Sequence, residues 1–180
     1  EKKDSILPFL EVYPKVSIIV PAYNEEVNIV SSLQNLLKQS YPNFNIIFVD
    51  DGSSDASLSR IQELRAKDSR VKFIQLSRNF GHQNALKAGL DHAQGAGVIS
   101  MDADLQHPPE LIPTLVEKWK TGFEVVYTIR KDDQKVPLLK KWTSKGFYKI
   151  TNKLAEIPME EGTADFRLLD RKVVEALKKF

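Results

Sequence analysis

Short runs of β-branched and aromatic residues alternate with helix-like segments along most of the chain. This alternation favours an α/β fold, in which the strands lie parallel and the connecting helices cover the sheet. We therefore expect one α/β domain built on a mixed, mostly parallel sheet. The predicted strands are Val16–Val20, Asn45–Asp50, Val71–Leu76, Val98–Asp102, Val125–Thr128 and Thr163–Leu169.

The segments between the strands have the apolar spacing of amphipathic helices. The predicted helices are Glu25–Lys38, Asp55–Lys67, His82–Ala93 and Pro109–Lys120. We expect Asn24 and Ser54 to cap the first two helices, because short polar side chains accept hydrogen bonds from free N–H groups there. Pro108 and Pro109 suit a first helical turn, where a missing N–H costs little.

The composition is that of a globular domain, with 42% hydrophobic and 28% charged residues in 180. No apolar run approaches the roughly 20 residues of a membrane span. The absence of cysteine excludes disulfides and thiolate metal ligands and is typical of a reducing compartment. A net charge of +2 gives no indication of nucleic-acid binding. Because the chain starts at Glu1 and ends at Phe180 without a tail signal, we expect a soluble fragment of a longer protein.

Polar residues follow each of the first five predicted strands. In open α/β sheets, ligands bind beyond the carboxyl ends of the strands, so we expect these residues to face one cleft. The strand ends are Pro21–Glu25, Asp50–Ser53, Ser77–Asn79, Asp102–Asp104 and Arg130.

The fourth strand end has the residue types of a metal site. Asp102, Asp104 and Gln106 share a period of two, which predicts that they project to the same side where the strand ends. Their oxygens suit Mg²⁺ or Mn²⁺, which complete their shells with phosphates and water. The sequence therefore indicates a metal and nucleotide-diphosphate site. The alternative is that the two aspartates only close a strand, since Asp is common in loops.

The second strand end has two interpretations. Asp50 and Asp51 could accept hydrogen bonds from ribose hydroxyls or a base N–H, or they could form a turn in which Gly52 takes positive φ. Tyr23 could cover the face of a base or be an ordinary half-buried aromatic. Glu25 could serve the same pocket or favour the positive end of its helix.

Four segments together resemble glycosyltransferase family 2. They are Val16–Glu26, Val49–Asp55, Ser77–Gln83 and Met101–Glu110. Asn-Glu-Glu and Asp-Asp-Gly-Ser are shared by many members. Asp-Ala-Asp-Leu-Gln-His-Pro-Pro-Glu is more specific to the polyprenyl-phosphate branch, which includes dolichyl-phosphate mannose synthases, bactoprenol glucosyltransferases and undecaprenyl-phosphate aminoarabinose transferase. The similarity spans about residues 16 to 170.

The resemblance implies a Rossmann-like GT-A fold, a nucleotide-sugar donor, UDP rather than GDP, and inversion at the anomeric carbon. The donor-binding residues that it implies are Pro21, Ala22, Tyr23, Glu25, Asp50, Asp51, Ser53, Arg78, Asp102 and Ala103. The metal ligands that it implies are Asp102, Asp104 and Gln106.

The resemblance also implies an acceptor, a polyprenyl phosphate. Such a phosphate is largely ionised near neutral pH, because its second pKa is about 6, so positioning cations can replace a general base. Arg130, Lys131 and Arg167 are the candidates for this clamp, since Arg presents a planar fork of donors. Including the residues that act on the leaving diphosphate, the predicted catalytic set is Asp104, Arg130, Asp165 and Arg167.

Asp165 occupies the place where many family 2 enzymes carry a catalytic carboxylate. We expect Asp165 to act as an acceptor-side or orienting carboxylate. A general base that serves a glycan hydroxyl is the alternative within enzymes, and a strand residue paired with Arg167 is the structural alternative. A receiver-like signalling domain and a silent sugar-nucleotide-binding domain are further alternatives, which Arg130 and the intact metal ligands disfavour.

Residues 135–153 combine lysines with Leu138, Trp142, Phe147 and Ile150 and contain no acidic residue. This composition is typical of a helix that lies on an anionic membrane surface, although a solvated helix packed on the core has it too. We expect the protein to act at the cytosolic face of a membrane, the bacterial inner membrane being favoured. Nucleic acid is not expected, and an oligomer is compatible with the sequence.

The expected organisation is an N-terminal extension at 1–15, a nucleotide-sugar-binding core at 16–130 and an acceptor and membrane-proximal part at 131–180, cut before transmembrane helices. His82, His92 and His107 match no common zinc spacing, and we expect structural roles for them.

Overall fold

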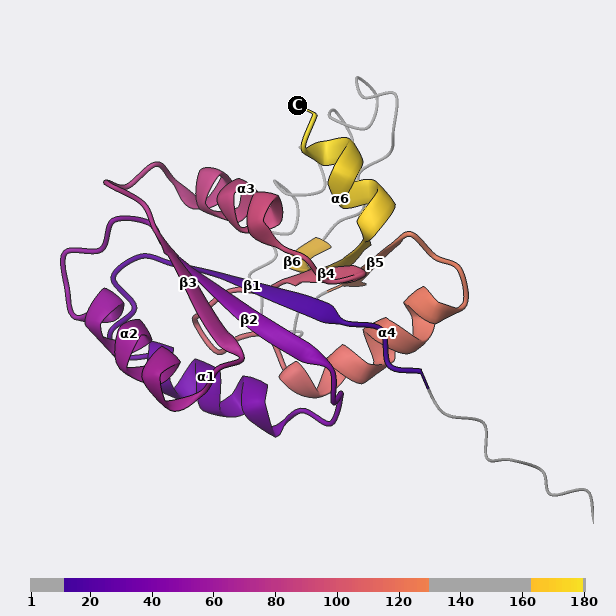
Figure 1. Cartoon of the computed structure of the whole chain (residues 1–180), viewed down its shortest axis with the longest axis horizontal. Helices are drawn as coiled ribbons and strands as arrows, with labels where there is room; N and C mark the ends of the chain where they lie inside the picture. Colours follow the sequence, from indigo (N-terminus) through magenta and orange to yellow (C-terminus); the bar gives the residue numbers. More distant parts are fainter. Residues whose placement is uncertain (1–11, 130–162, 180) are drawn as a thin grey trace, which may run out of the picture.

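The described part of the chain forms a sheet of six strands in the order β3-β2-β1-β4-β6-β5 (Figure 1). The computed structural model describes residues 12–129 and 163–179. β6 is antiparallel to β4 and β5, whereas β1 is parallel to β2 and β4, and β2 to β3. The predicted mixed, mostly parallel α/β domain is confirmed. The strands are β1 Val16–Ala22, β2 Phe44–Asp50, β3 Val71–Gln75, β4 Gly97–Ser100, β5 Val125–Ile129 and β6 Thr163–Asp170.

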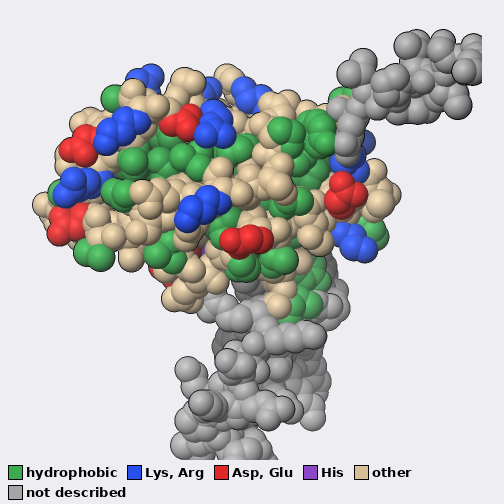
Figure 2. All heavy atoms as spheres, turned by 90° about the horizontal axis from the view of Figure 1, so that it is seen from below, with side chains coloured by type: hydrophobic (Ala, Val, Ile, Leu, Met, Phe, Trp, Pro, Cys, Tyr) green, Lys and Arg blue, Asp and Glu red, His purple; other side chains and the backbone are tan. Residues whose placement is uncertain are grey.

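Helices cover both faces of the sheet (Figure 1). α1 Ile29–Lys38, α2 Ser57–Lys67, the 3₁₀ turn η1 Pro109–Leu111 and α4 Ile112–Lys120 lie on one face. α3 His82–His92 and α6 Arg171–Leu177 lie on the other. On the α1/α2/α4 face, basic and acidic side chains are interspersed among apolar ones (Figure 2).

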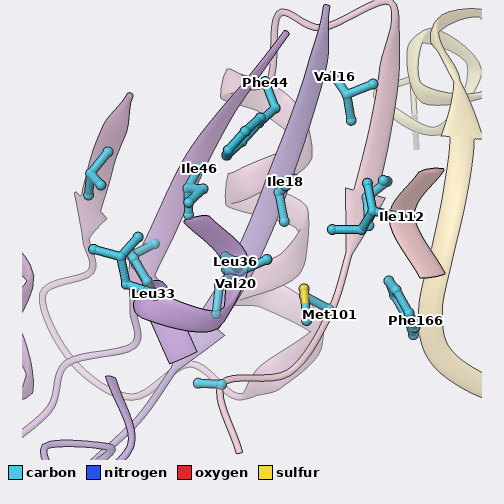
Figure 3. Packing of buried hydrophobic residues seen from close by; sticks show 14 of the residues in the cluster. Val16, Ile18, Val20, Leu33, Leu36, Phe44, Ile46, Met101, Ile112 and Phe166 are labelled. Atoms are coloured by element: carbon cyan, nitrogen blue, oxygen red, sulfur yellow. The ribbon is translucent and has the colours of Figure 1, made fainter. Parts of the chain in front are cut away.

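Burial on both faces explains the apolar sequences of the central strands. Every residue of β1 and β2 is buried, which is the pattern of strands that are covered on both sides. Ile18 lies in the core layer on the α1 face of the sheet, which also contains Phe166 (Figure 3). Ile19 lies in the layer on the α3 face, which also contains Leu86. The alternation along one strand thus divides the core into two layers.

The two predicted helix caps are wrong. α1 begins at Ile29, four residues later than expected, and Asn24 instead takes a left-handed conformation with φ 56°. Its side chain accepts a hydrogen bond from the Ser54 backbone N–H at 2.9 Å. α2 begins at Ser57 without a side-chain cap. Asn24 and Ser54 therefore join the loops after β1 and β2 to each other.

One carboxylate ties the end of β6 to both helical layers. Trp119 of α4 donates its indole N–H to Asp170 at 2.7 Å, and the backbone N–H of Lys172 donates to the other oxygen at 2.9 Å, which caps α6. The Lys172 bond, then the Trp119 bond, hold the pKa of Asp170 below its ordinary value in spite of burial.

We predict that Asp170→Asn lowers the free energy of unfolding at pH 7 and that this difference shrinks in acid. A folded-state pKa below the unfolded value stabilises the protein above pH about 4, and the contribution is lost as the pH falls further. Urea unfolding at several pH values measures this. Asp91→Asn, in an exposed pair with Lys87, is the control, and an equal acid response of both variants would contradict the prediction.

Candidate functional site

A cleft of about 430 Å³ opens at the carboxyl ends of the parallel strands. Residues that follow β1, β2, β3 and β4 all line it. This agrees with the strand-end rule, by which ligands of open α/β sheets bind beyond the carboxyl ends of the strands. Arg130, after β5, lies outside the described residues. The lining residues are Pro21, Ala22, Tyr23, Glu25, Asp51, Asn79, His82, Ala85, Asp102, Ala103, Asp104 and Asp165.

Asp165 reaches the cleft because β6 runs in the reverse direction. Ser100 at the end of β4 pairs with Arg167 in β6, and the Ser100 hydroxyl donates to the Asp165 carbonyl at 2.7 Å. The first residues of β6 therefore lie beside the last residues of β4. A carboxylate that is distant in sequence joins Asp102 in this way.

A turn, and not a strand, presents the two aspartates after β4. β4 ends at Ser100, and Leu105 has φ 65°. The predicted alternation through Gln106 is therefore wrong as a geometric argument. Asp102 and Asp104 still line the cleft. Gln106 is exposed outside that lining, and its backbone N–H donates to the Asp104 carboxylate at 3.1 Å.

The buried His107 stabilises this turn. It is 5% exposed, its Nδ1 accepts the Asp102 backbone N–H at 3.1 Å, and its ring stacks on Phe166 with centroids 5.4 Å apart. His92 contacts the Ala88 carbonyl at 2.8 Å at the far end of α3. Both contacts are structural in kind.

His82 is the cleft residue that the sequence interpretation missed. It is the first residue of α3, and its Nε2 lies 3.8 Å from an Asp102 oxygen and 3.8 Å from an Asp165 oxygen. The available signal was its position, because residues that begin the helix after a strand also face the carboxyl edge of the sheet. A search for zinc spacing could not detect it.

The donor atoms at this point fit a divalent cation. One atom each from His82, Asp102 and Asp165 lies within 4.8 Å of the others, and Asp104 lines the same cleft. Carboxylate oxygens with an imidazole suit Mn²⁺, and carboxylates and water suit Mg²⁺.

Asp51 holds two of the cleft loops together. Its carboxylate is 3% exposed and accepts the backbone N–H groups of Phe80 and Gly81 at 2.8 and 2.9 Å. Gly52 has φ 69°, and a Cβ there would lie 2.4 Å from the Arg78 backbone carbon. The loops after β2 and β3 thus approach as closely as the backbone permits, which fixes the start of α3.

The remaining residues predicted to bind the donor differ in their surroundings. Tyr23 is 47% exposed in the cleft wall. Glu25 accepts from the Asn28 side chain at 2.8 Å. Asp50 is 1% exposed and outside the lining, and its Oδ1 is a buried oxygen without a hydrogen-bond partner in the described part of the chain. The Ser53 hydroxyl accepts the Asn24 N–H at 3.0 Å.

Of the predicted basic residues, the structure describes Arg78 and Arg167, and neither lines the cleft. Arg78 is outside the cleft lining, with its guanidinium 4.8 Å from the Phe80 ring centre. Arg167 donates to Asp165 at 2.5 Å and is partly exposed. Arg130, Lys131 and the segment 135–153 fall outside the described residues.

The family model of Glycosyl transferase family 2 matches residues 17–178. The chain belongs to glycosyltransferase family 2. A Bacillus subtilis relative, the uncharacterized glycosyltransferase YkcC, is 46% identical over 91% of this chain and 51% of its own length. The bactoprenol glucosyl transferase of Shigella phage SfV is 42% identical over 91% of this chain and 54% of its own. The chain thus spans about half the length of these relatives.

Solved structures of similar proteins confirm the GT-A fold. The mannosyltransferase PcManGT from Pyrobaculum calidifontis, in complex with GDP-Man and Mn²⁺, covers 92% of this chain with 47% of its own, at TM-score 0.65 and 24% identity. TarS 1-349 from S. aureus with UDP-GlcNAc covers 69% of this chain with 36% of its own, at TM-score 0.59 and 29% identity. Among the described helices of this family 2 chain, none is long and apolar enough to cross a bilayer.

We predict that Asp51→Ala destabilises the fold by about 1–3 kcal/mol, because it leaves the Phe80 and Gly81 N–H groups without their acceptor. Asp51→Asn retains one acceptor oxygen and should lose less. Denaturant unfolding measures both variants. Equal stability of Asp51→Ala and wild type would show that the loops after β2 and β3 do not depend on this carboxylate.

Proposed function

We propose that the chain is the catalytic domain of an inverting glycosyltransferase that moves a sugar from a nucleotide diphosphate to a polyprenyl phosphate. The observation that carries the proposal is the composition of the cleft. Tyr23 and Asp51 line it, and so do His82, Asp102 and Asp165, whose potential ligand atoms lie within 4.8 Å of one another. Asp104 is a further carboxylate of the same lining. An aromatic surface joined to an oxygen-rich cation site suits a nucleoside diphosphate.

The nucleoside part of the donor is proposed to bind against Pro21, Ala22, Tyr23 and Glu25. The exposed Tyr23 ring offers a face for a base. Asp50, which was also predicted to bind the donor, is buried outside the cleft lining. UDP is preferred over GDP in this proposal. The similarity to TarS, at 29% identity and solved with UDP-GlcNAc, supports that preference.

Asp102 and Asp104 are proposed to hold a divalent cation, Mg²⁺ or Mn²⁺, with Gln106 as the third ligand predicted from sequence. Such a cation offsets the negative charge that develops on the leaving diphosphate. The turn at Leu105 gives both aspartates access to the cleft. His107 keeps Asp102 in place through the backbone N–H.

The acceptor side is proposed to consist of Asp165 and Arg167, joined by Arg130 and Lys131. The 42% identity to the bactoprenol glucosyl transferase of phage SfV supports a polyprenyl phosphate as acceptor. Arg167 already donates to one oxygen of Asp165, which suits a carboxylate that orients a cation. An ionised phosphate attacks as it is, so this arrangement provides charge and position for the acceptor.

The proposed setting is the cytosolic face of a membrane, where residues 135–153 would meet anionic headgroups. Residues 16–130 would form the donor-binding core, 131–180 the membrane-proximal part and 1–15 an extension. An oligomer is compatible with this arrangement.

Calorimetry of the 180-residue chain with UDP and GDP, each with and without Mn²⁺, tests the proposal. We expect Mn²⁺ to tighten UDP binding by roughly tenfold or more, and UDP to bind more tightly than GDP. Asp104→Asn should remove the gain from Mn²⁺, because it removes a negative oxygen ligand.

The control is Asp91→Asn, which makes the same substitution in the exposed pair with Lys87 on α3. It should retain the full effect of Mn²⁺. Failure of both nucleotides to bind, or binding that Mn²⁺ does not change, would overturn the proposed donor and cofactor.

A further inference from the structure

A second hollow, of about 340 Å³, lies between α3, α6 and the sheet. We call it the α3–α6 groove. Leu86 and Leu90 of α3, Leu169 of β6 and Leu177 of α6 line it, together with Gln83 and Arg167. The volume is within the range of about 300 to 1,000 Å³ that is typical of ligand pockets.

The groove changes from polar to apolar along the strands. Ser100 pairs with Arg167 at one level of its floor, and Val98 pairs with Leu169 two residues further along. On α3 the order is the same, since Gln83 comes one residue after His82 and the two leucines follow in later turns. The polar end is therefore the end that adjoins the cleft.

Two connections join the groove to the cleft. Asp165 lines the cleft and Arg167 lines the groove, and their side chains are hydrogen-bonded at 2.5 Å. His82 lines the cleft and its neighbour Gln83 lines the groove. A molecule with an anionic head beside Arg167 would thus have its head near the sugar donor and its tail between α3 and α6.

The cations of the groove favour an anion at that end only. Lys87 is already paired with Asp91 at 2.9 Å. Arg167 has five N–H donors, and Asp165 is its hydrogen-bond partner among the described residues. The remaining donors suit the oxygens of a phosphate.

We propose that the α3–α6 groove binds the first isoprenoid units of the acceptor lipid, with the lipid phosphate at Arg167. This proposal rests on the proposed function for the nature of the acceptor. The apolar tail is removed from water when it enters the groove, which favours binding in proportion to the area buried. The charge of Arg167 sets the orientation of the lipid, with its phosphate at the polar end. The rest of a long lipid extends beyond the groove.

The test is the binding of soluble polyprenyl phosphates of increasing length to the 180-residue chain, measured by calorimetry without nucleotide. Dimethylallyl, geranyl and farnesyl phosphate share one head and differ in tail. We expect affinity to rise by roughly tenfold or more from the shortest to the longest. An affinity that does not depend on tail length would overturn the proposal.

Two groove variants locate the effect. Gln83→Trp fills the polar end from an exposed position, and Leu177→Gln makes the apolar wall polar at a residue that is 41% exposed. Both should reduce the gain from tail length to about threefold or less. The matched controls are Gln94→Trp, exposed and outside the groove, and Leu111→Gln, 40% exposed on the opposite face.

A farnesyl phosphate that carries a photoreactive group on its tail identifies the surface directly. We expect labelled peptides from α3, β6 and α6. Labelling confined to residues 135–153, or groove variants that keep the full gain from tail length, would assign the tail to another surface and contradict the proposal.

The outcomes separate this proposal from the proposed function. If the chain binds UDP with Mn²⁺ but shows no effect of tail length, the groove proposal is wrong and the proposed donor site stands. If the chain shows the effect of tail length but binds neither nucleotide, the groove stands as a lipid-phosphate site and the glycosyltransferase proposal is wrong.

Discussion

The reversal of β6 is the constraint on which the candidate site depends. Five of the six strands run in one direction, so their carboxyl ends form a single edge. Because β6 enters between β4 and β5 from that edge, its first residues lie where the others end. Asp165 thereby lines the cleft together with Asp102, and Arg167, two residues later, lines the α3–α6 groove. A parallel sixth strand would have placed both residues at another level.

The acidic residues of the cleft divide into two kinds by what their oxygens contact. Asp51 is engaged by two backbone N–H groups and shapes the loops. Asp102 and Asp165 lie 3.8 Å from His82, which is longer than a hydrogen bond. The Asp102 oxygen and the Asp165 oxygen that face His82 can therefore approach a cation, while the other Asp165 oxygen accepts from Arg167. The protein thus uses carboxylates of the same chemistry both to build the cleft and to leave a binding surface inside it.

Much of this arrangement could be predicted from the sequence, because burial on both faces of β1 and β2 produces apolar runs that are easy to detect. The strand-end rule then brought Tyr23, Asp51 and Asp102 together correctly. Local geometry was harder to predict. Asn24 takes a left-handed conformation in contact with the distant loop at Ser54, so a cap was predicted where the structure has a loop contact. The left-handed Leu105 lies in a turn where a period of two predicted a strand extension. His82 was missed because its two partners, Asp102 and Asp165, come from segments that are distant from it in sequence.

The central claim is that one cleft at the strand ends holds both the nucleotide and its cation. Anomalous diffraction at the manganese edge, from crystals of the chain grown with UDP and Mn²⁺, tests it most directly. The account predicts an anomalous peak within ligand distance of Asp102 or Asp104, with the uracil ring against Tyr23. A nucleotide bound elsewhere, or a peak that contacts neither aspartate, would contradict it.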